Sequence, residues 1–370
     1  MKLNLKNIQK ASLITLLLIF ASCENKNSII EITDEKFKTA LLTKSCKDIS
    51  GTTLENIDIN NDGEIQISEA ENIRSLNISG LGISSLKGLS FFRNLKELYC
   101  DNNKIETIDL TSIRDLEILK CYANELKTLD VSKNTKLHTI WTATNKLTTI
   151  DLSQNKALEE FYISGNSLLS KELDFSNNHL LKRLSYHDCP ITSIDVSTLS
   201  NLEYLYIDRT KIETIDLTKN DKLIGLYTNS AGLKSIDLSA NLDLEELQIS
   251  NNKLNTINVS TNKKLEILMC NGNNIENLNV SNNPLLNVLW FHNNPVTYVN
   301  IKNSSTLDGL DLRHFDEELG RASDHMVGLK MENTPFIKKI CLDYEDIKLV
   351  KNALGKDSEV TLDSNCNSKI

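Results

Sequence analysis

The sequence has no block of basic residues, and this absence excludes one class of partner. Its 370 residues carry 41 Lys and Arg against 50 Asp and Glu, a formal net charge of -9, and the acidic residues are spread along the chain. A nucleic-acid-binding protein needs clustered positive charge to neutralise phosphates. We therefore expect no nucleic-acid partner.

Catalytic motifs are missing too. The six histidines are scattered, and the chain has no nucleophile elbow, phosphate-binding loop or metal-hydrolase spacing. Each of these motifs brings an acid, a base or a nucleophile to one point, and catalysis needs such convergence. We therefore expect a protein that is not an enzyme.

Long apolar runs are absent beyond the N-terminus. Lys2, Lys6 and Lys10 precede an apolar run at residues 11–21, which is too short to cross a bilayer as a helix. A short apolar run behind positive charge is typical of a signal peptide, which we assign to residues 1–22. The protein is therefore expected to be exported.

The apolar run ends in Phe20, Ala21, Ser22 and Cys23, and small residues directly before a cysteine resemble the lipobox of bacterial lipoprotein precursors. The resemblance implies that Cys23 carries a lipid anchor and that residues 23–28 form a linker. It also implies a bacterial cell envelope, at the outer membrane or the cell surface. The family pattern usually has leucine where Phe20 stands, so ordinary cleavage near Ser22 is the alternative.

One pattern, LxxLxLxxNxL, recurs twelve times, as in LKELYCDNNKI from Leu95 and LEELQISNNKL from Leu244. The units start at Ile73, Leu95, Leu116, Leu137, Leu158, Leu181, Leu202, Leu223, Leu244, Leu265, Leu286 and Leu307, and most spacings are 21 residues. This pattern resembles the leucine-rich-repeat signature over about two thirds of the chain. The first unit, from Ile73, resembles a repeat of the internalins.

Within each unit, the xLxL alternation points the leucines to one face of a short strand. The asparagine at the ninth place can hydrogen-bond backbone groups at the following turn. Seven units keep it, as Asn103, Asn124, Asn145, Asn166, Asn252, Asn273 and Asn294. Cys189 takes this place in one unit, a replacement known in the family, while Leu81, Thr210, Ala231 and Phe315 depart from it.

The second half of each unit repeats the same alternation, as in IETIDLTSI from Ile105 and LTTIDLSQN from Leu147. Each coil therefore resembles two nested strands, as in a bacterial subclass of the family. We predict a leucine-rich-repeat solenoid with parallel β ladders on both long sides of a stacked right-handed coil, in contrast to a helix-backed horseshoe.

A single coil cannot fold alone, because its aliphatic side chains are buried only by neighbouring coils. Both ends of the array therefore need caps. We assign residues 29–72 to an N-terminal cap, 73–315 to the repeats and 316–370 to a C-terminal cap. Both caps are expected to contain short helices, in DEKFKTALLTK from Asp34 and in IKLVKNAL from Ile347.

A loop at residues 58–69 reads DINNDGEIQISE and matches the calcium loop of EF-hand proteins. The oxygen ligands would be Asp58, Asn60, Asp62, the Glu64 carbonyl and Glu69. Because a hard cation needs several oxygens at once, this spacing predicts bound Ca²⁺ with a structural role. A turn rich in Asx side chains that caps the solenoid without metal is the alternative.

Most of the cysteines have a place in the repeat. Its inward sixth position holds Cys100, Cys121, Cys270, Thr142 and Thr228, which indicates small buried residues. Similar bacterial repeat proteins end in a cysteine-bracketed cap, and this resemblance implies a disulfide between Cys341 and Cys366. In the chain-entropy model such a bridge stabilises the fold by roughly 3 kcal/mol. Cys46 has no evident partner.

The fifth place of each unit lies at the centre of the outward face of its strand. It holds Tyr99, Lys120, Trp141, Tyr162, Ser185, Tyr206, Tyr227, Gln248, Met269, Trp290 and Asp311 in order, with Tyr122 and Tyr204 beside them. Aromatic residues favour strands in general, yet the second half of the unit has only Tyr298 outward. This asymmetry predicts a binding face formed by Tyr99, Lys120, Tyr122, Trp141, Tyr162, Tyr204, Tyr206, Tyr227 and Trp290.

The outward face of the second half is acidic instead. It presents Asp109, Asp130, Asp151, Asp174, Asp195, Asp216 and Asp237, followed by Asn258, Asn279 and Asn300. Stacked like charges repel, so something must compensate them. We favour hydrogen bonding to backbone amides and hydroxyls over bound cations.

Three functions fit these patterns. The first is a lipid-anchored module of the cell surface that binds a protein through the aromatic face, as the resemblance to adhesins and interaction proteins of the family implies. The second is a lipoprotein that stacks glycan rings on the same aromatic side chains. A spacer in the envelope is the third, and the aromatic asymmetry argues against it.

We predict that Cys23→Ala prevents lipidation, because only this cysteine follows small residues at the end of the apolar run. The variant is expected to lose its membrane anchor. Metabolic labelling with a fatty-acid analogue measures the effect, and equal labelling of variant and wild type would contradict it.

Overall fold

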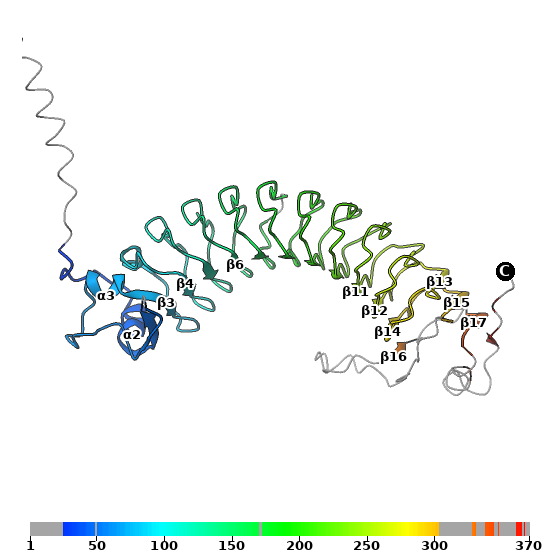
Figure 1. The fold of residues 1–370 in the computed structure, drawn as a ribbon, viewed down its shortest axis with the longest axis horizontal. Helices are drawn as coiled ribbons and strands as arrows, with labels where there is room; N and C mark the ends of the chain where they lie inside the picture. Colours follow the sequence, from blue (N-terminus) through cyan, green and yellow to red (C-terminus); the bar gives the residue numbers. More distant parts are fainter. Residues whose placement is uncertain are drawn as a thin grey trace, which may run out of the picture.

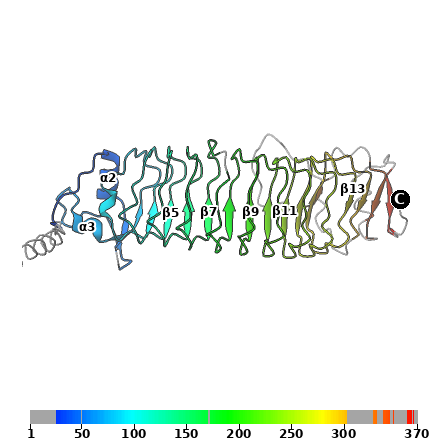
Figure 2. The same ribbon diagram turned by 90° about the horizontal axis from the view of Figure 1, so that it is seen from above.

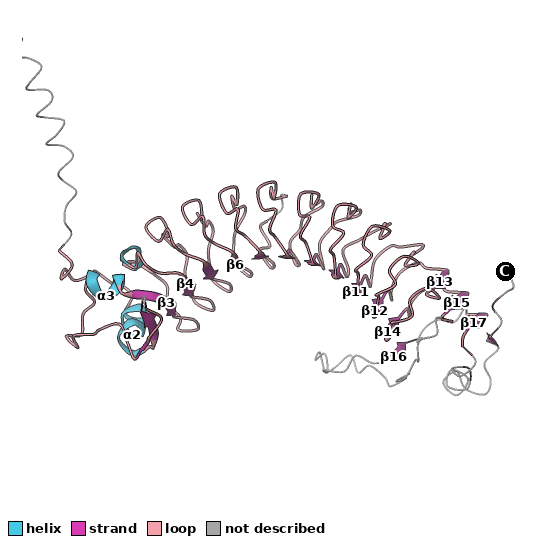
Figure 3. Ribbon diagram, in the orientation of Figure 1, coloured by secondary structure: helices cyan, strands magenta, loops and turns pink. Residues whose placement is uncertain are grey.

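The computed structural model describes residues 25–48, 50–169, 172–302, 328–330, 337–343, 347, 360–364 and 366. The chain winds into a curved solenoid whose strands line the concave side (Figure 1). Seen from above, the strands lie side by side along the array (Figure 2). The helices drawn in Figure 3 lie at the N-terminal end of the array. The assigned signal peptide and Cys23 lie outside the described residues.

The concave side is a 14-stranded sheet in the order β16-β14-β12-β11-β10-β9-β8-β7-β6-β5-β4-β3-β1-β2. Its repeat strands are β3 (Ile73–Asn77), β4 (Glu97–Tyr99), β5 (Ile118–Lys120), β6 (Thr139–Trp141), β7 (Glu160–Tyr162), β8 (Arg183–Ser185), β9 (Tyr204–Tyr206), β10 (Gly225–Tyr227), β11 (Glu246–Gln248), β12 (Ile267–Met269) and β14 (Val288–Trp290). Neighbours run parallel and in register, as Leu98 pairs with Leu119 and Leu119 with Ile140. The predicted parallel-strand solenoid is confirmed.

The core is a continuous column of aliphatic side chains inside the coils. Leu98, Leu119 and Ile140 come from successive strands and are fully buried. Each is covered by the coils before and after it, which removes apolar surface from water at about 25 cal/mol per Å². The inward cysteines, Cys100 and Cys121 among them, are buried in the same column, as the repeat pattern predicts.

The recurring ninth-place asparagines of the repeat pattern connect their coil to the one before it. Asn124 shows the arrangement: its Oδ1 accepts from the Ile105 amide at 2.9 Å, and its Nδ2 donates to the Cys100 and Cys121 carbonyls at 3.0 and 3.1 Å. The side chain is buried, so it satisfies backbone groups that water cannot reach. The predicted bonding to backbone at the turn is confirmed.

Units without this asparagine keep only part of the connection. Cys189 Sγ donates to the Ile163 carbonyl at 3.7 Å, and Thr210 Oγ1 donates to the Ile207 carbonyl at 2.9 Å. The cysteine sulfur forms only weak hydrogen bonds, and the Thr210 bond stays within its own coil. The coil-to-coil bonding is therefore weaker at these two turns.

A second column of asparagines, which the sequence analysis missed, ends the second half of most coils. Its members are Asn134, Asn155, Asn178, Asn220, Asn241, Asn262 and Asn283, all fully buried. Asn134 Nδ2 donates to the Leu110 and Ile113 carbonyls at 3.1 and 2.6 Å, and Asn155 donates to the Val131 and Asn134 carbonyls. The signal was present in the sequence as a recurring asparagine at the end of VSKN, LSQN and related segments.

The prediction of a second ladder along the whole array is wrong for most described coils. Regular strands of the second half occur only towards the C-terminus, in a 4-stranded sheet of β13 (Asn277–Asn279), β15 (Tyr298–Asn300), β17 (Lys339–Cys341) and β18 (Thr361–Asp363). In earlier coils, the second halves of neighbouring coils are joined by isolated backbone hydrogen bonds. The Glu125 amide, for example, donates to the Ile105 carbonyl at 2.9 Å, but no regular ladder forms. The convex side of a curved array is longer than the concave side, so its coils are splayed apart (Figure 1).

The segment assigned to the C-terminal cap contributes strands to both sheets. β16 (Gly328–Lys330) pairs in parallel with β14, and β17 pairs with β15, so both ladders continue into the segment assigned to the C-terminal cap. The twelfth unit, expected from Leu307, lies outside the described residues, as do Phe315 and Asp311. Of the helix expected from Ile347, only that residue is described, and it is helical.

The N-terminal cap covers the first coil with a helix and two antiparallel strands. The helix predicted after Asp34 is confirmed as α2 (Glu35–Thr43), and β1 (Cys46–Asp48) pairs with β3, the first repeat strand. The remaining elements of this region are β2 (Thr53–Leu54), α3 (Ile67–Glu71) and the short 3-10 helix η1 (Leu89–Phe91). The edge of the sheet is therefore closed by non-repeat structure, as solenoids require.

Asp34 joins the cap to the first coil. Its Oδ1 accepts from the Lys36 and Phe37 amides at the start of α2, and its Oδ2 accepts from the Ser84 and Ser85 amides at 2.8 and 3.1 Å. Burial on its own would raise the pKa of this carboxyl, but the hydrogen bonds outweigh it and lower the pKa from 3.8 to about 2. The ionised form therefore stabilises the fold.

Cys341 and Cys366 form a disulfide, with their Cα atoms 5.7 Å apart and a sequence separation of 25. The bridge holds the last described segment against β17. Cys46 is a buried free thiol, and burial raises the pKa of Cys121 and of Cys270 to about 12. Thiols in this state are unreactive at neutral pH.

Among the described residues, no helix is long and apolar enough to cross a membrane.

We predict that Asp34→Ala lowers the free energy of unfolding by about 1–2 kcal/mol, because the helix loses its cap and the first coil loses its tie to α2. Thermal unfolding measures the loss. Asp34→Asn should retain more stability than alanine, because its amide oxygen can still cap the helix.

The same carboxyl predicts a pH dependence. Its folded pKa is below the unfolded value, so its contribution to stability is present above about pH 4 and is lost as the pH falls towards 2. Asp34→Asn should lack this part of the acid response. Identical acid unfolding of Asp34→Asn and wild type would contradict the assignment.

Candidate functional site

The sheet register places the predicted aromatic residues in one row on the concave face. In order, the row holds Tyr99, Lys120, Trp141, Tyr162, Ser185, Tyr206, Tyr227, Gln248, Met269 and Trp290. We call this set the aromatic row. Most of its aromatic side chains are half-buried, so they pack on their neighbours and still present surface to a partner.

The N-terminal part of the aromatic row is a stack around Trp141. The Trp141 and Tyr162 rings are 5.0 Å apart at 11°, and Lys120 Nζ lies 3.4 Å from the Trp141 ring on the side of the preceding coil. Lys120 also lies 5.8 Å from the Tyr99 ring, and Tyr122 contacts Trp141 at 6.4 Å. Both faces of the indole are thus covered by side chains of this chain, which holds it rigidly.

A second stack is centred on Tyr206. Its ring lies 4.5 Å from that of Tyr227 at 13°, and the Tyr204 ring lies beside it at 6.5 Å. The Arg183 guanidinium lies over Tyr204 at 5.2 Å. The Tyr227 hydroxyl donates a short hydrogen bond to Glu246. This second group therefore joins rings to charged side chains that the sequence analysis did not single out.

Ser185 separates the two stacks. The side chain is buried, and its hydroxyl lies 2.6 Å from that of Ser164 and 3.2 Å from His187 Nδ1. The predicted face thus consists of two aromatic groups separated by the polar side chains around Ser185. Trp290 lies three coils beyond Tyr227. The sequence predicted the members of the row but not this division.

The tyrosines of the row are protonated over the physiological range. Burial raises the pKa of Tyr99, Tyr162 and Tyr206. The pKa of Tyr227 is raised by burial first and then by its hydrogen bond to Glu246. Each phenol therefore offers an uncharged ring to a partner, although the hydroxyl protons of Tyr99 and Tyr227 are already donated to Glu97 and Glu246.

Ion pairs between successive coils flank the first part of the row. Lys96 pairs with Glu117 at 2.6 Å, and Lys182 pairs with Glu159 at 2.8 Å. Such exposed pairs contribute little to stability individually, about 0–1 kcal/mol. They do hold the local charge near zero. Opposite charges about one repeat apart in the sequence would have revealed them.

The aspartates of the second half are hydrogen-bonded as the sequence analysis favoured. Asp130 Oδ1 accepts from the Ser132 amide at 2.9 Å, and Asp109 accepts from both the amide and the hydroxyl of Thr111. The same bond to the amide two residues later recurs at Asp151, Asp174, Asp195, Asp216 and Asp237. These bonds lower the pKa of all seven carboxyls.

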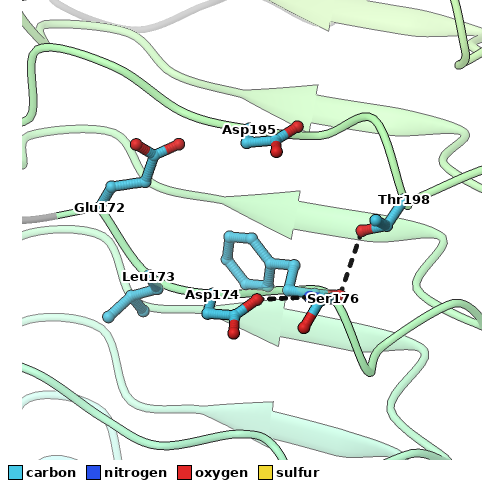
Figure 4. A pocket seen from close by; sticks show the side chains of 7 residues that line it. Glu172, Leu173, Asp174, Ser176, Asp195 and Thr198 are labelled. Carbon is cyan, nitrogen blue, oxygen red and sulfur yellow. Dashed lines mark hydrogen bonds between the residues drawn. The ribbon is translucent and has the colours of Figure 1, made fainter.

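One irregular coil opens a shallow pocket on this acidic side. Glu172, Asp174 and Asp195 lie around it, with Phe175 and Thr198 completing the wall (Figure 4). The cavity volume is about 320 Å³. The carboxylate oxygens of Asp174 and Asp195 are held by their own Asx turns, so the pocket follows the general pattern of the aspartate ladder.

The predicted calcium loop closes on itself through hydrogen bonds. Asp58 Oδ2 accepts from the Gly63 amide at 2.9 Å, and Glu69 accepts from the Ile59 and Gln66 amides at 2.8 and 2.9 Å. Both carboxyl side chains are more than nine-tenths buried, at 8% and 6% exposure. The first and twelfth places of the loop are therefore both bonded to backbone amides of the loop itself.

The other predicted ligands are arranged differently. Asp62 Oδ2 accepts from the Asn60 and Gln66 side-chain amides at 2.9 and 2.6 Å, and the Glu64 side chain pairs with Lys38 at 2.8 Å. In the part of the chain that is described, no three His, Cys, Asp or Glu side chains are gathered closely enough to hold a metal. Metal binding would require Asp62 to exchange these amide contacts.

Comparison with known proteins bears on the fold. Residues 94–116 match the family model described as Leucine Rich Repeat, and no curated protein matches the sequence. The functional domain of InlJ from Listeria monocytogenes, which includes a cysteine ladder, is 28% identical with a TM-score of 0.67. The match covers 74% of this chain and 57% of the InlJ domain, so this chain spans little more than half of that relative's length.

Two further solved structures resemble most of the chain. An internalin (inlF) from Listeria monocytogenes is 18% identical with a TM-score of 0.56 and covers 90% of this chain and 96% of its own. The Leptospira interrogans LRR protein LIC12759 is 16% identical with a TM-score of 0.56, covering 79% and 84%. The chain therefore has the leucine-rich-repeat solenoid fold that bacterial proteins of this kind share.

Proposed function

We propose that this chain is a binding module of the bacterial cell envelope that holds a protein partner on its aromatic row. The observation that carries the proposal is the concentration of stacked, half-exposed rings on the concave side, where the fold does not need them. Large rigid aromatic groups supply binding energy at low entropic cost. A curved array brings many of them to one partner at once.

A protein partner is favoured over a glycan by the arrangement of the rings. A sugar stacks on an open aromatic face, but Lys120 and Tyr162 cover the two faces of Trp141, and Tyr206 covers one face of Tyr227. These rings offer edges and hydroxyl groups more than faces. Edges and donors suit the side chains and backbone carbonyls of a protein.

The proposed location is the cell envelope, with the chain attached through a lipid on Cys23. Support comes from the apolar run that ends in Ala21, Ser22 and Cys23, and from the likeness to bacterial leucine-rich-repeat proteins. The solenoid would then extend away from the anchor, with the aromatic row on its concave side.

We also propose that the loop at 58–69 binds Ca²⁺ and stabilises the entry to the first coil. Asp58 and Glu69 support this, because both carboxylates are buried and bond backbone amides of one loop whose sequence has the EF-hand spacing. Burial of negative charge is costly unless a cation or several donors compensate it. Bound calcium would supply that compensation more strongly than amides do.

The calcium proposal predicts a higher melting temperature with calcium, because a ligand that binds only the folded state stabilises it, by about 2.7 kcal/mol at a concentration 100 times the Kd. Asp58→Asn with Glu69→Gln should abolish the shift, while Glu55→Gln, an exposed carboxylate outside the loop, should retain it. Calorimetry with calcium and after chelation measures the effect. Identical transitions in wild type would leave only the Asx-turn interpretation.

The proposed partner surface predicts that Trp141→Ala with Tyr162→Ala weakens binding, because it removes one stack. Truncation of hot-spot aromatics typically costs 2 kcal/mol or more, roughly thirtyfold in affinity. The ligand is first identified by screening the chain from Glu24 onward against surface-protein extracts and polysaccharides. Affinity and melting temperature of each variant are then measured.

The matched control is Asp130→Ala with Asp151→Ala on the opposite side of the coils. A surface site without a role in binding usually changes affinity by less than about 0.5 kcal/mol. Loss of binding by the aspartate pair alone would place the functional face on the acidic side. A polysaccharide as the sole ligand would replace the protein partner with the glycan alternative.

A further inference from the structure

Several carboxylates along the concave sheet form ion pairs with basic side chains, whereas three carboxylates near β11 and β12 form none among the described residues. Near β5 to β8, Glu117, Glu159 and Glu160 each pair with Lys96, Lys182 or Arg183, at 2.6, 2.8 and 3.0 Å. At β11 and β12 the equivalent carboxylates are Glu245, Glu246 and Glu266. None of these three has a Lys, Arg or His within 4.0 Å among the described residues.

These three carboxylates are close neighbours. Glu245 directly precedes Glu246, the first residue of β11, and the Glu266 amide donates to the Glu245 carbonyl of the preceding coil at 2.8 Å. Successive parallel strands are about 4.8 Å apart, a distance at which like charges repel appreciably even in water. Glu266 is exposed and the other two are partly exposed, so all three are open to an external cation.

An aromatic ring adjoins this acidic group. The Tyr227 hydroxyl donates to Glu246, and one face of its ring is stacked on Tyr206. The other face is directed towards the next residue of the aromatic row, the neutral Gln248. No cation of the described chain lies over Tyr227.

The first stack shows what such a ring accepts. There Lys120 lies between Tyr99 and Trp141, 3.4 Å from the indole. In the second stack Arg183 covers Tyr204. The chain thus supplies its own cation to both groups of rings but leaves the outer face of Tyr227 without one. An open ring face next to a carboxylate such as that of Glu246 is a favourable site for an ammonium or guanidinium group.

We propose that Tyr227, Gln248, Glu245, Glu246 and Glu266 form an acidic-aromatic patch that binds an arginine or lysine side chain in a basic segment of the protein partner. This deepens the proposed function and rests on it. The guanidinium or ammonium group lies over Tyr227 between the carboxylates, and its aliphatic stem packs along Gln248 towards Met269.

Charge distinguishes three possible ligands of this patch: a glycan, a second copy of this chain and a basic protein segment. A neutral glycan cannot compensate three carboxylates. A second copy of this chain carries a net charge of -9, so its approach is opposed by repulsion. A basic protein segment neutralises the patch and fills the cation position over Tyr227, which the other two do not.

The test uses an acetylated and amidated peptide of alternating arginine and glycine, and the same peptide with citrulline, the uncharged analogue of arginine, in each arginine position. Affinity for the whole mature chain is measured by calorimetry at low and at physiological ionic strength. The arginine peptide should bind about tenfold more tightly, and the difference should decrease as salt rises. Equal affinity for the two peptides would overturn the proposal.

The variant is Glu245→Gln with Glu246→Gln and Glu266→Gln. It should reduce affinity for the arginine peptide about tenfold, and Tyr227→Leu should reduce it as well. The matched control removes the same charge from the other side of the coils, by Asp130→Asn, Asp151→Asn and Asp174→Asn, and should change affinity by less than about twofold. An equal loss of affinity in both triple variants would show that binding depends only on net charge, and it would contradict the proposed patch.

The two proposals fail separately. A natural partner that is lost with Trp141→Ala and Tyr162→Ala but kept by the glutamine variant leaves the aromatic row as the binding face and overturns the acidic-aromatic patch. Loss with the glutamine variant alone supports the patch and removes the first stack from the interface. Because the citrulline comparison uses the wild-type chain, it decides the charge requirement even where a variant does not fold.

Discussion

Each coil of this protein is stable only because the next coil buries it, and the contact between coils is the constraint on which the other features depend. The leucine column excludes water, and two columns of buried asparagines satisfy backbone groups across each boundary, as Asn124 and Asn134 do. Where Cys189 or Thr210 replaces an asparagine, the coil loses hydrogen bonds but keeps its place in the stack. Close stacking therefore tolerates single replacements.

The same contact converts a sequence period into rows of side chains on the surface. Residues 21 apart become neighbours in adjacent strands, so the stack of Trp141 on Tyr162 follows from the repeat length. Ion pairs such as Lys96 with Glu117 arise in the same way. A substitution in one unit is therefore felt mainly in the two flanking units, as expected for an array with nearest-neighbour contacts.

Departures from the period distinguish one part of the surface from another. Ser185 interrupts the aromatic row and creates two stacks, and the carboxylates near Glu246 form no ion pair among the described residues. A perfectly regular array would present the same surface at every coil. The irregular positions give this solenoid distinct regions on which a partner can be recognised in one orientation.

The sequence by itself determined the coil length, the inward leucines and cysteines, the helix after Asp34 and the membership of the aromatic row, because each depends on local spacing. Only the tertiary structure shows which rings stack, which carboxylates form ion pairs, and that β16 pairs with β14. It also decided that the second ladder forms only towards the C-terminus. These features depend on the curvature of the array and on contacts between coils, which no single repeat encodes.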